Sequence, residues 1–144
     1  MKLSNRRRKK IYIWIIKLMK NYLLITGGAG FVGTNLIKYL LKKTKYKIIS
    51  LDNYSSGTKR NHIFNKRLKY ITGDTKDISR LLKTYKNKIK TIFHFGEFSR
   101  IFQSFEKIDI CIKSNSIGSL EVFKYCLENK IKLIYSATSG GFRN

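Results

Sequence analysis

The chain has 144 residues, which is enough for one domain with a hydrophobic core and too few for two. A hydrophobic fraction of 42%, with nine Tyr and nine Phe, predicts a folded globule and excludes a disordered tail. The net charge is +23, but outside the N-terminus the cations are dispersed, which favours a compositional bias over a nucleic-acid-binding surface.

Residues 1–18 form an N-terminal extension in which a basic run, Arg6 to Lys10, precedes an apolar run, Ile11 to Ile16. Lys17 interrupts the apolar run and no small-residue cleavage site follows, so the segment does not fit a signal peptide. The apolar run is also too short to cross a bilayer. We predict no membrane span and a cytoplasmic protein.

Three interpretations of this extension stay open. It is suited to lying on an anionic membrane surface. It is also suited to a basic nucleic-acid-binding module, in which Tyr12 and Trp14 would stack beside the cations, although nucleic acid is not the partner that we expect. The simplest interpretation is that translation begins at Met19, shortly before the first predicted strand.

From Tyr22 onward, short apolar runs alternate with helical periodicity, which is typical of a parallel sheet built from βαβ units. The predicted strands are 22–26, 47–51, 68–72, 91–95 and 132–135, and the predicted helices are 31–43, about 75–85, and about 105 or 109 to 128. The side chains expected to face inward from the first helix are Phe31, Leu36, Ile37, Leu40 and Leu41. Right-handed crossovers then give residues 19–144 an α/β, Rossmann-type doubly wound parallel sheet in the order 3-2-1-4-5, with no sequence left for a sixth strand.

A glycine-rich turn, Gly28-Ala29-Gly30-Phe31-Val32-Gly33, fits G-x-G-x-x-G between the first strand and the first helix. Gly27 and Gly28 are expected to permit a tight turn, Gly30 to let a pyrophosphate approach the backbone, and Gly33 to allow close packing of the helix. The helix N-terminus would then present free N–H groups to the phosphates.

Asp52 ends the second strand, 19 residues after Gly33. A carboxylate at this position accepts hydrogen bonds from the adenosine ribose and repels a 2'-phosphate, so the sequence predicts NAD rather than NADP. A simpler role for Asp52, as a turn or cap residue before Asn53, stays open. The cysteines, Cys111 and Cys126, and the two histidines show no ligand spacing, and we predict no metal site.

With these features in place, residues 19–144 resemble the extended short-chain dehydrogenase/reductase family, namely the NAD-dependent epimerases and dehydratases of sugar nucleotides, and most closely the UDP-glucose 4-epimerase group. The segments that carry the resemblance are TGGAGFVGTNLIKYLL, LDNYSSG, GDTKD, IFHFGEFSR and NSIGS. The resemblance implies that NAD is the cofactor and that it is bound by Gly27, Gly30, Phe31, Val32, Gly33, Asp52, Asn53, Ser55, Ser56, Gly57, Asp74, Thr75, Phe95, Gly96, Glu97 and Asn115.

Within that set, the resemblance places Phe31 and Val32 at the pyrophosphate, the LDNYSSG segment around the adenosine ribose, and Asp74 with Thr75 at the adenine. It makes Asn115 the residue that braces the loop after the fourth strand. Glu97 and Arg100 replace residues that are small or aliphatic in the family, which leaves the sugar-nucleotide substrate open.

The final residues, LIYSATSGGFRN, resemble the family's fifth strand, in which Thr138 matches the catalytic Ser or Thr. Phe142 and Arg143 stand where Tyr-Gly is usual, and the family's Tyr-x-x-x-Lys segment would follow some two dozen residues later. The pair that does occur, Tyr39 and Lys43 on the first predicted helix, is interpreted as a chance match.

We therefore expect these residues to be the cofactor half of a nucleotide-sugar epimerase or dehydratase, unable to catalyse the reaction alone because the general base is absent. A premature stop, a frameshift or a split gene would explain such a sequence. One alternative is a split enzyme that a complementing C-terminal chain completes. A homodimer, and the choice between epimerase and dehydratase, also stay open.

Overall fold

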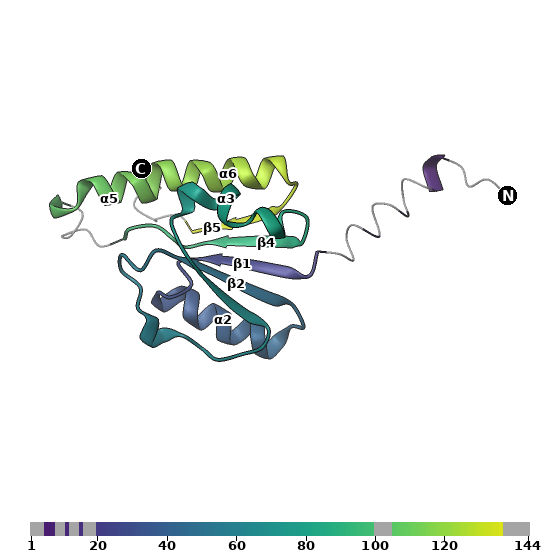
Figure 1. Ribbon diagram of the computed structural model, residues 1–144, viewed down its shortest axis with the longest axis horizontal. Helices are drawn as coiled ribbons and strands as arrows, with labels where there is room; N and C mark the ends of the chain where they lie inside the picture. Colours follow the sequence, from purple (N-terminus) through teal and green to yellow (C-terminus); the bar gives the residue numbers. More distant parts are fainter. Residues whose placement is uncertain (1–4, 8–10, 12–14, 16–19, 100–104, 137–144) are drawn as a thin grey trace, which may run out of the picture.

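The computed structural model of the protein describes residues 5–7, 11, 15, 20–99 and 105–136. Five parallel strands form one sheet in the order β3-β2-β1-β4-β5, as predicted (Figure 1). The bounds of the strands are β1 Tyr22–Thr26, β2 Lys47–Asp52, β3 Leu68–Thr72, β4 Ile89–His94 and β5 Lys132–Tyr135. Neighbouring strands in register, such as Leu24 opposite Ile49 and Ile92, place their carboxyl ends along a common edge.

Helices cover both faces of this sheet (Figure 1). Helix α2, Phe31–Lys43, packs on one face, and α3, Ile78–Leu81, lies with α5, Ile108–Ile112, and α6, Ser119–Glu128, on the other. Tight 3-10 turns occupy Lys59–Asn61, Thr75–Asp77 and Lys83–Tyr85, and a π-helical segment, Lys113–Gly118, joins α5 to α6. The doubly wound Rossmann-type arrangement predicted from the alternating pattern is therefore present.

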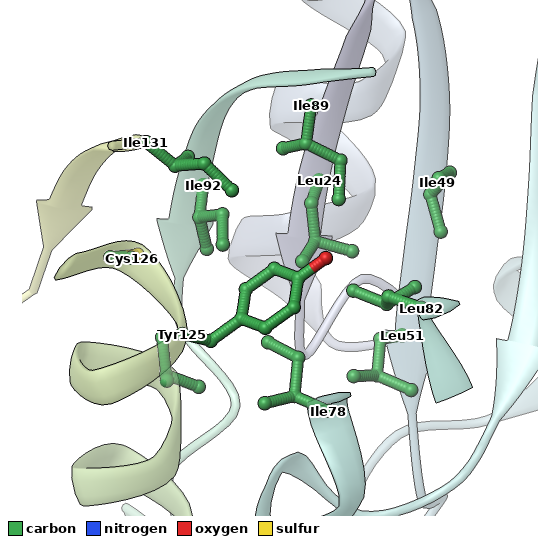
Figure 2. Close-up of a cluster of buried hydrophobic side chains, with 11 residues drawn as sticks. Leu24, Ile49, Leu51, Ile78, Leu82, Ile89, Ile92, Tyr125, Cys126 and Ile131 are labelled. Carbon is green, nitrogen blue, oxygen red and sulfur yellow. The ribbon is translucent and has the colours of Figure 1, made fainter. Parts of the chain in front are cut away.

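Two hydrophobic clusters form because strand side chains alternate between the faces of the sheet. On β1, Leu23 and Ile25 pack toward α2, whereas Leu24 packs into the larger cluster on the opposite face. Figure 2 shows this larger cluster, in which the Tyr125 hydroxyl points in among aliphatic side chains. That hydroxyl has no hydrogen-bond partner among the described residues, and burial raises the pKa of Tyr125 to about 12.

Several predicted helix bounds differ from the structure. The helix expected at about 75–85 is a four-residue helix, α3, between two 3-10 turns, and the long C-terminal helix is interrupted by its π-helical segment. The prediction that Phe31 faces inward is wrong, since its side chain is 83% exposed. Phe31 begins α2 at the carboxyl edge of the sheet, where the first turn lies beyond the core, whereas Ile37 and Leu40 further along the helix are buried.

No helix in the described part of the chain is long and apolar enough to cross a membrane. The predictions for Met19, Arg100 and Thr138, and most of those for the extension at 1–18, concern residues outside the described ranges.

Candidate dinucleotide-binding site

A cleft of about 410 Å³ opens at the carboxyl edge of the sheet, where the loops after β1, β2, β4 and β5 meet. All of the predicted cofactor-binding residues line it except Asp74 and Asn115. The lining residues from the prediction are Gly27, Gly30, Phe31, Val32, Gly33, Asp52, Asn53, Ser55, Ser56, Gly57, Thr75, Phe95, Gly96 and Glu97.

The glycines after β1 are needed for different reasons. Gly27 has a left-handed backbone with φ +69°, and a Cβ there would lie 2.7 Å from the Phe95 carbonyl oxygen. A Cβ at Gly33 would lie 2.3 Å from the Gly27 carbonyl oxygen, so the first turn of α2 packs directly on the glycine turn. The protein's own backbone therefore requires both residues to be glycine.

Gly30 is different, because its φ of −80° and ψ of 175° are open to any residue. A Cβ there would meet only the Gly27 carbonyl oxygen, at 3.3 Å. Backbone conformation does not require glycine at this position, which lines the cleft at the start of α2, and a Cβ would need only a small shift of the Gly27 carbonyl, far less than at Gly27 or Gly33.

Asp52 is buried at the end of β2, and its carboxylate holds two neighbouring loops. Its Oδ2 accepts a hydrogen bond from the Ala29 N–H at 2.8 Å, and its Oδ1 accepts one from the Tyr54 N–H at 2.8 Å. The bond to Tyr54 is the turn interaction that the simpler sequence interpretation anticipates. Because a carboxylate oxygen accepts more than one hydrogen bond, these contacts leave capacity toward the cleft.

The loop after β2 is tied to the glycine turn and to the loop after β3. The Ala29 carbonyl oxygen accepts hydrogen bonds from the Thr58 N–H and from the Asn61 Nδ2. Asp74 lies outside the cleft lining, where its Oδ1 accepts a 2.6 Å hydrogen bond from the Asn53 Nδ2. Asp74 thus positions Asn53, while Thr75 lines the cleft.

A chain of buried polar groups supports the other side of the cleft. The Thr26 hydroxyl oxygen accepts hydrogen bonds from the N–H groups of Phe95 and Gly96, which directs its proton to His94 Nδ1 at 2.6 Å. His94 therefore carries its proton on Nε2, which lies 2.9 Å from the Ser119 hydroxyl. Burial lowers the pKa of this fully buried imidazole below 6.5, an effect that the charge of Glu97 opposes.

The polar chain ends on Glu97. The Ser119 hydroxyl donates to Glu97 Oε1 at 2.9 Å, and the Tyr135 hydroxyl donates to the same oxygen at 2.6 Å. Donating this hydrogen bond to Glu97, together with burial and the charge of Glu97, raises the pKa of Tyr135 to about 12. Glu97 is thus a carboxylate of the cleft that α6 and β5 hold in position.

Asn115 lies in the π-helical segment and outside the cleft lining. Its Oδ1 accepts a hydrogen bond from the Phe98 N–H at 2.6 Å, and its Nδ2 donates to the Phe98 carbonyl oxygen at 2.9 Å. The two bonds hold the backbone just after Glu97.

Five further residues line the cleft that sequence reasoning did not select. Gly73 opens the GDTKD motif and Ser114 precedes Asn115, so both neighbour predicted residues. The others, Leu51, Ser99 and Ser136, come to the cleft from strand ends and a loop, and nothing in their local sequence marks them.

The described cleft lining contains two carboxylates, those of Asp52 and Glu97, and no Lys, Arg or His. Within the described residues, no group of three His, Cys, Asp or Glu side chains is placed to hold a metal ion. Tyr39, from the chance Tyr-x-x-x-Lys match, is exposed on α2 and does not line the cleft.

The model of the NAD dependent epimerase/dehydratase family matches residues 23–142. The chain belongs to this family. The resemblance drawn from the sequence motifs is thereby confirmed, and the family's dependence on NAD agrees with the cofactor predicted from the glycine loop and Asp52.

Three similar proteins illustrate how much of such an enzyme this chain represents. The ADP-L-glycero-D-manno-heptose-6-epimerase of Brachyspira hyodysenteriae is 27% identical over 124 residues, which are 85% of this chain and 38% of that protein. The UDP-glucose 4-epimerase of Thermotoga maritima, solved with UDP-glucose, is 27% identical with a TM-score of 0.73, covering 83% of this chain and 38% of that one. WbmG of Bordetella bronchiseptica, solved with NAD, is 25% identical with a TM-score of 0.70, covering 79% of this chain and 36% of that one. The chain thus spans less than two fifths of each protein.

The buried imidazole makes stability depend on pH. Because the pKa of His94 is lower in the folded protein than in the unfolded chain, the unfolded chain binds the proton first as pH falls. The contribution of neutral His94 to the free energy of unfolding is fully present above pH 6.5. It is lost as pH falls through 6.5 toward the pKa of His94 in the folded protein, and the free energy of unfolding then changes by at most about 1.4 kcal/mol per pH unit. Urea unfolding between pH 7.5 and 5.5 should show a shallower loss for His94→Gln than for the native chain. Free energies of unfolding that fall in parallel with pH for the native chain and for His94→Gln would contradict this expectation.

Proposed function

We propose that this chain is the NAD-binding part of a nucleotide-sugar epimerase or dehydratase. The observation that carries the proposal is Gly30, a glycine on the cleft whose backbone conformation is open to any residue. Space for a ligand at the start of α2 explains it, since a side chain there would project toward a pyrophosphate. The NAD complex of WbmG, which shares this fold, supports the same ligand.

The start of α2 supplies the phosphate-binding groups. The helix is 13 residues long, has no side-chain cap and has no acidic residue in its first turn. Its first N–H groups therefore lack intrahelical partners, and with the positive end of the helix dipole they favour an anion. Phe31, Val32 and Gly33 would hold the pyrophosphate, and the described lining adds no cationic side chain to them.

The end of β2 supplies the adenosine site. Asp52 would accept hydrogen bonds from the ribose hydroxyls with the lone pairs that its two backbone contacts leave. Asn53, Ser55, Ser56 and Gly57 line the same end of the cleft, and Thr75 lies where the adenine is expected.

Bound NAD would supply a hydride acceptor for a carbon of the sugar. The residues described here bind and orient the cofactor, and Thr138 matches a family residue that orients a sugar hydroxyl. Both named epimerase relatives act on a nucleotide sugar, which supports that class of substrate for the complete enzyme. A complementing chain and a homodimer remain predictions.

The 144 residues by themselves should not turn over a nucleotide sugar, because a threonine hydroxyl is too weak an acid to replace the family's tyrosine as general base. Incubation of the purified chain with NAD and UDP-glucose, followed by separation of the sugar nucleotides, should show no UDP-galactose. The control is a full-length UDP-glucose 4-epimerase under the same conditions. NAD-dependent product from the isolated chain would contradict the assignment of the base to further sequence.

Gly30→Ala should separate binding from folding. Its backbone conformation suits alanine and its Cβ requires only a small shift of the Gly27 carbonyl, so the free energy of unfolding should fall by no more than about 1 kcal/mol. NAD affinity, measured by isothermal titration, should fall about tenfold or more because the methyl group lies in the phosphate site. Gly33→Ala is the matched control and should lose about 2 kcal/mol of stability through its clash with Gly27. A stable Gly30→Ala variant with native NAD affinity would contradict the proposed site.

Asp52→Asn tests cofactor choice. The amide keeps the size of the side chain and one acceptor oxygen, but removes the charge that repels a 2'-phosphate. The native protein should bind NAD more tightly than NADP. In the variant, the ratio of the NADP dissociation constant to the NAD dissociation constant should be about tenfold smaller. A ratio is used because loosening of the Ala29 and Tyr54 contacts would affect both cofactors alike. Asp77→Asn, the same change at a residue outside the cleft lining, should leave the ratio unchanged.

A further inference from the structure

Glu97 is a negative charge built into one end of the cleft. It lies three residues after β4, is half-buried, and lines the cleft. Hydroxyl donors from α6 and β5, Ser119 and Tyr135, converge on Oε1 and leave Oε2 without a partner among the described residues. The side chain is therefore fixed in position by its neighbours while part of its carboxylate stays available to a ligand.

The sheet order indicates which part of a dinucleotide meets this charge. Strand order reverses between β1 and β4, and a dinucleotide crosses the sheet edge at such a switch point. The glycine turn and Asp52 place the adenosine half on the side of β1 and β2. The other half, which carries the nicotinamide, then lies over β4 and β5, on the side of Glu97.

The two redox forms of the cofactor differ in charge on that half. The nicotinamide ring carries a positive charge in NAD+ and none in NADH. The described cleft lining contributes no cation that would neutralise Glu97, and Asp52 lies at the adenosine end. We propose that Glu97 makes this cleft prefer NAD+ over NADH, an inference that rests on the proposed NAD site.

The geometry of the polar chain supports this role. Thr26 donates to His94, His94 donates to Ser119, and Ser119 donates to Glu97 Oε1. Each of these buried groups thus has a hydrogen-bond partner, and none of them occupies Glu97 Oε2. The Asn115 bonds to Phe98 hold the backbone that follows. A charge held in this way stabilises an adjacent cation without first reorganising.

Glu97→Gln is the variant that tests the charge. The amide oxygen can still accept from Ser119 and Tyr135, so the local packing is retained while the charge is removed. The dissociation constants of NAD+, NADH and ADP-ribose are measured on the full 144-residue chain by isothermal titration. We expect the native preference for NAD+ over NADH to fall about tenfold in the variant. ADP-ribose has no nicotinamide, so its affinity should not change.

Glu128→Gln provides a charge-matched control, because Glu128 is exposed at the end of α6 and does not line the cleft. This variant should keep the native NAD+ to NADH ratio. An unchanged ratio in Glu97→Gln, or an equal loss of affinity for all three ligands, would overturn the role of the Glu97 charge while leaving the NAD site intact. Failure of the folded native chain to bind any of them would overturn the proposed function and this inference together.

Discussion

The hydrogen bond from the Ala29 N–H to the Asp52 carboxylate couples the two loops on which the cleft depends. Ala29 is fully buried, and its carbonyl oxygen is held in turn by Thr58 and Asn61 from the loop after β2. A hydrogen bond from a backbone N–H to a charged acceptor is costly to break when both residues are this deeply buried. The end of the cleft where we propose that adenosine binds is therefore shaped by the protein's own contacts.

The opposite end of the cleft is organised by a second set of polar contacts, which also starts from β1. Thr26 is the last residue of β1. Its hydroxyl oxygen accepts a hydrogen bond from the backbone after β4, and its hydroxyl donates to His94 Nδ1. From there the chain of hydrogen bonds passes through α6 to Glu97 and β5. Because one set of contacts begins at the last residue of β1 and the other in the turn that follows it, the central strand aligns the two halves of the cleft.

Within the described part of the chain, the large positive charge does not reach this cleft. Its described lining has two carboxylates and no cation, although the whole chain carries +23. Several lysines lie instead over tyrosine rings, as Lys47 does over Tyr22 and Lys90 over Tyr46. Phosphate recognition at this site would accordingly rest on the start of α2, where N–H groups and the helix dipole act at short range.

The sequence by itself determined the strand order, the glycine turn and the acid at the end of β2. These features follow from local rules: alternation of apolar runs, the need of Gly27 for a left-handed backbone, and the position of Asp52 at a strand end. Periodicity failed for Phe31, because an apolar residue in the first turn of a helix lies beyond the core that the later turns contact.

Only the tertiary structure decided which side chains share the cleft and which support it. Asp74 and Asn115 do not line the cleft: Asp74 holds Asn53, and Asn115 holds the Phe98 backbone in the loop after β4, the bracing role that the resemblance implies. The link from His94 through Ser119 to Glu97 joins residues up to 25 positions apart, and no local pattern specifies it. Such contacts depend on how α6, which follows the π-helical segment, packs beside β4.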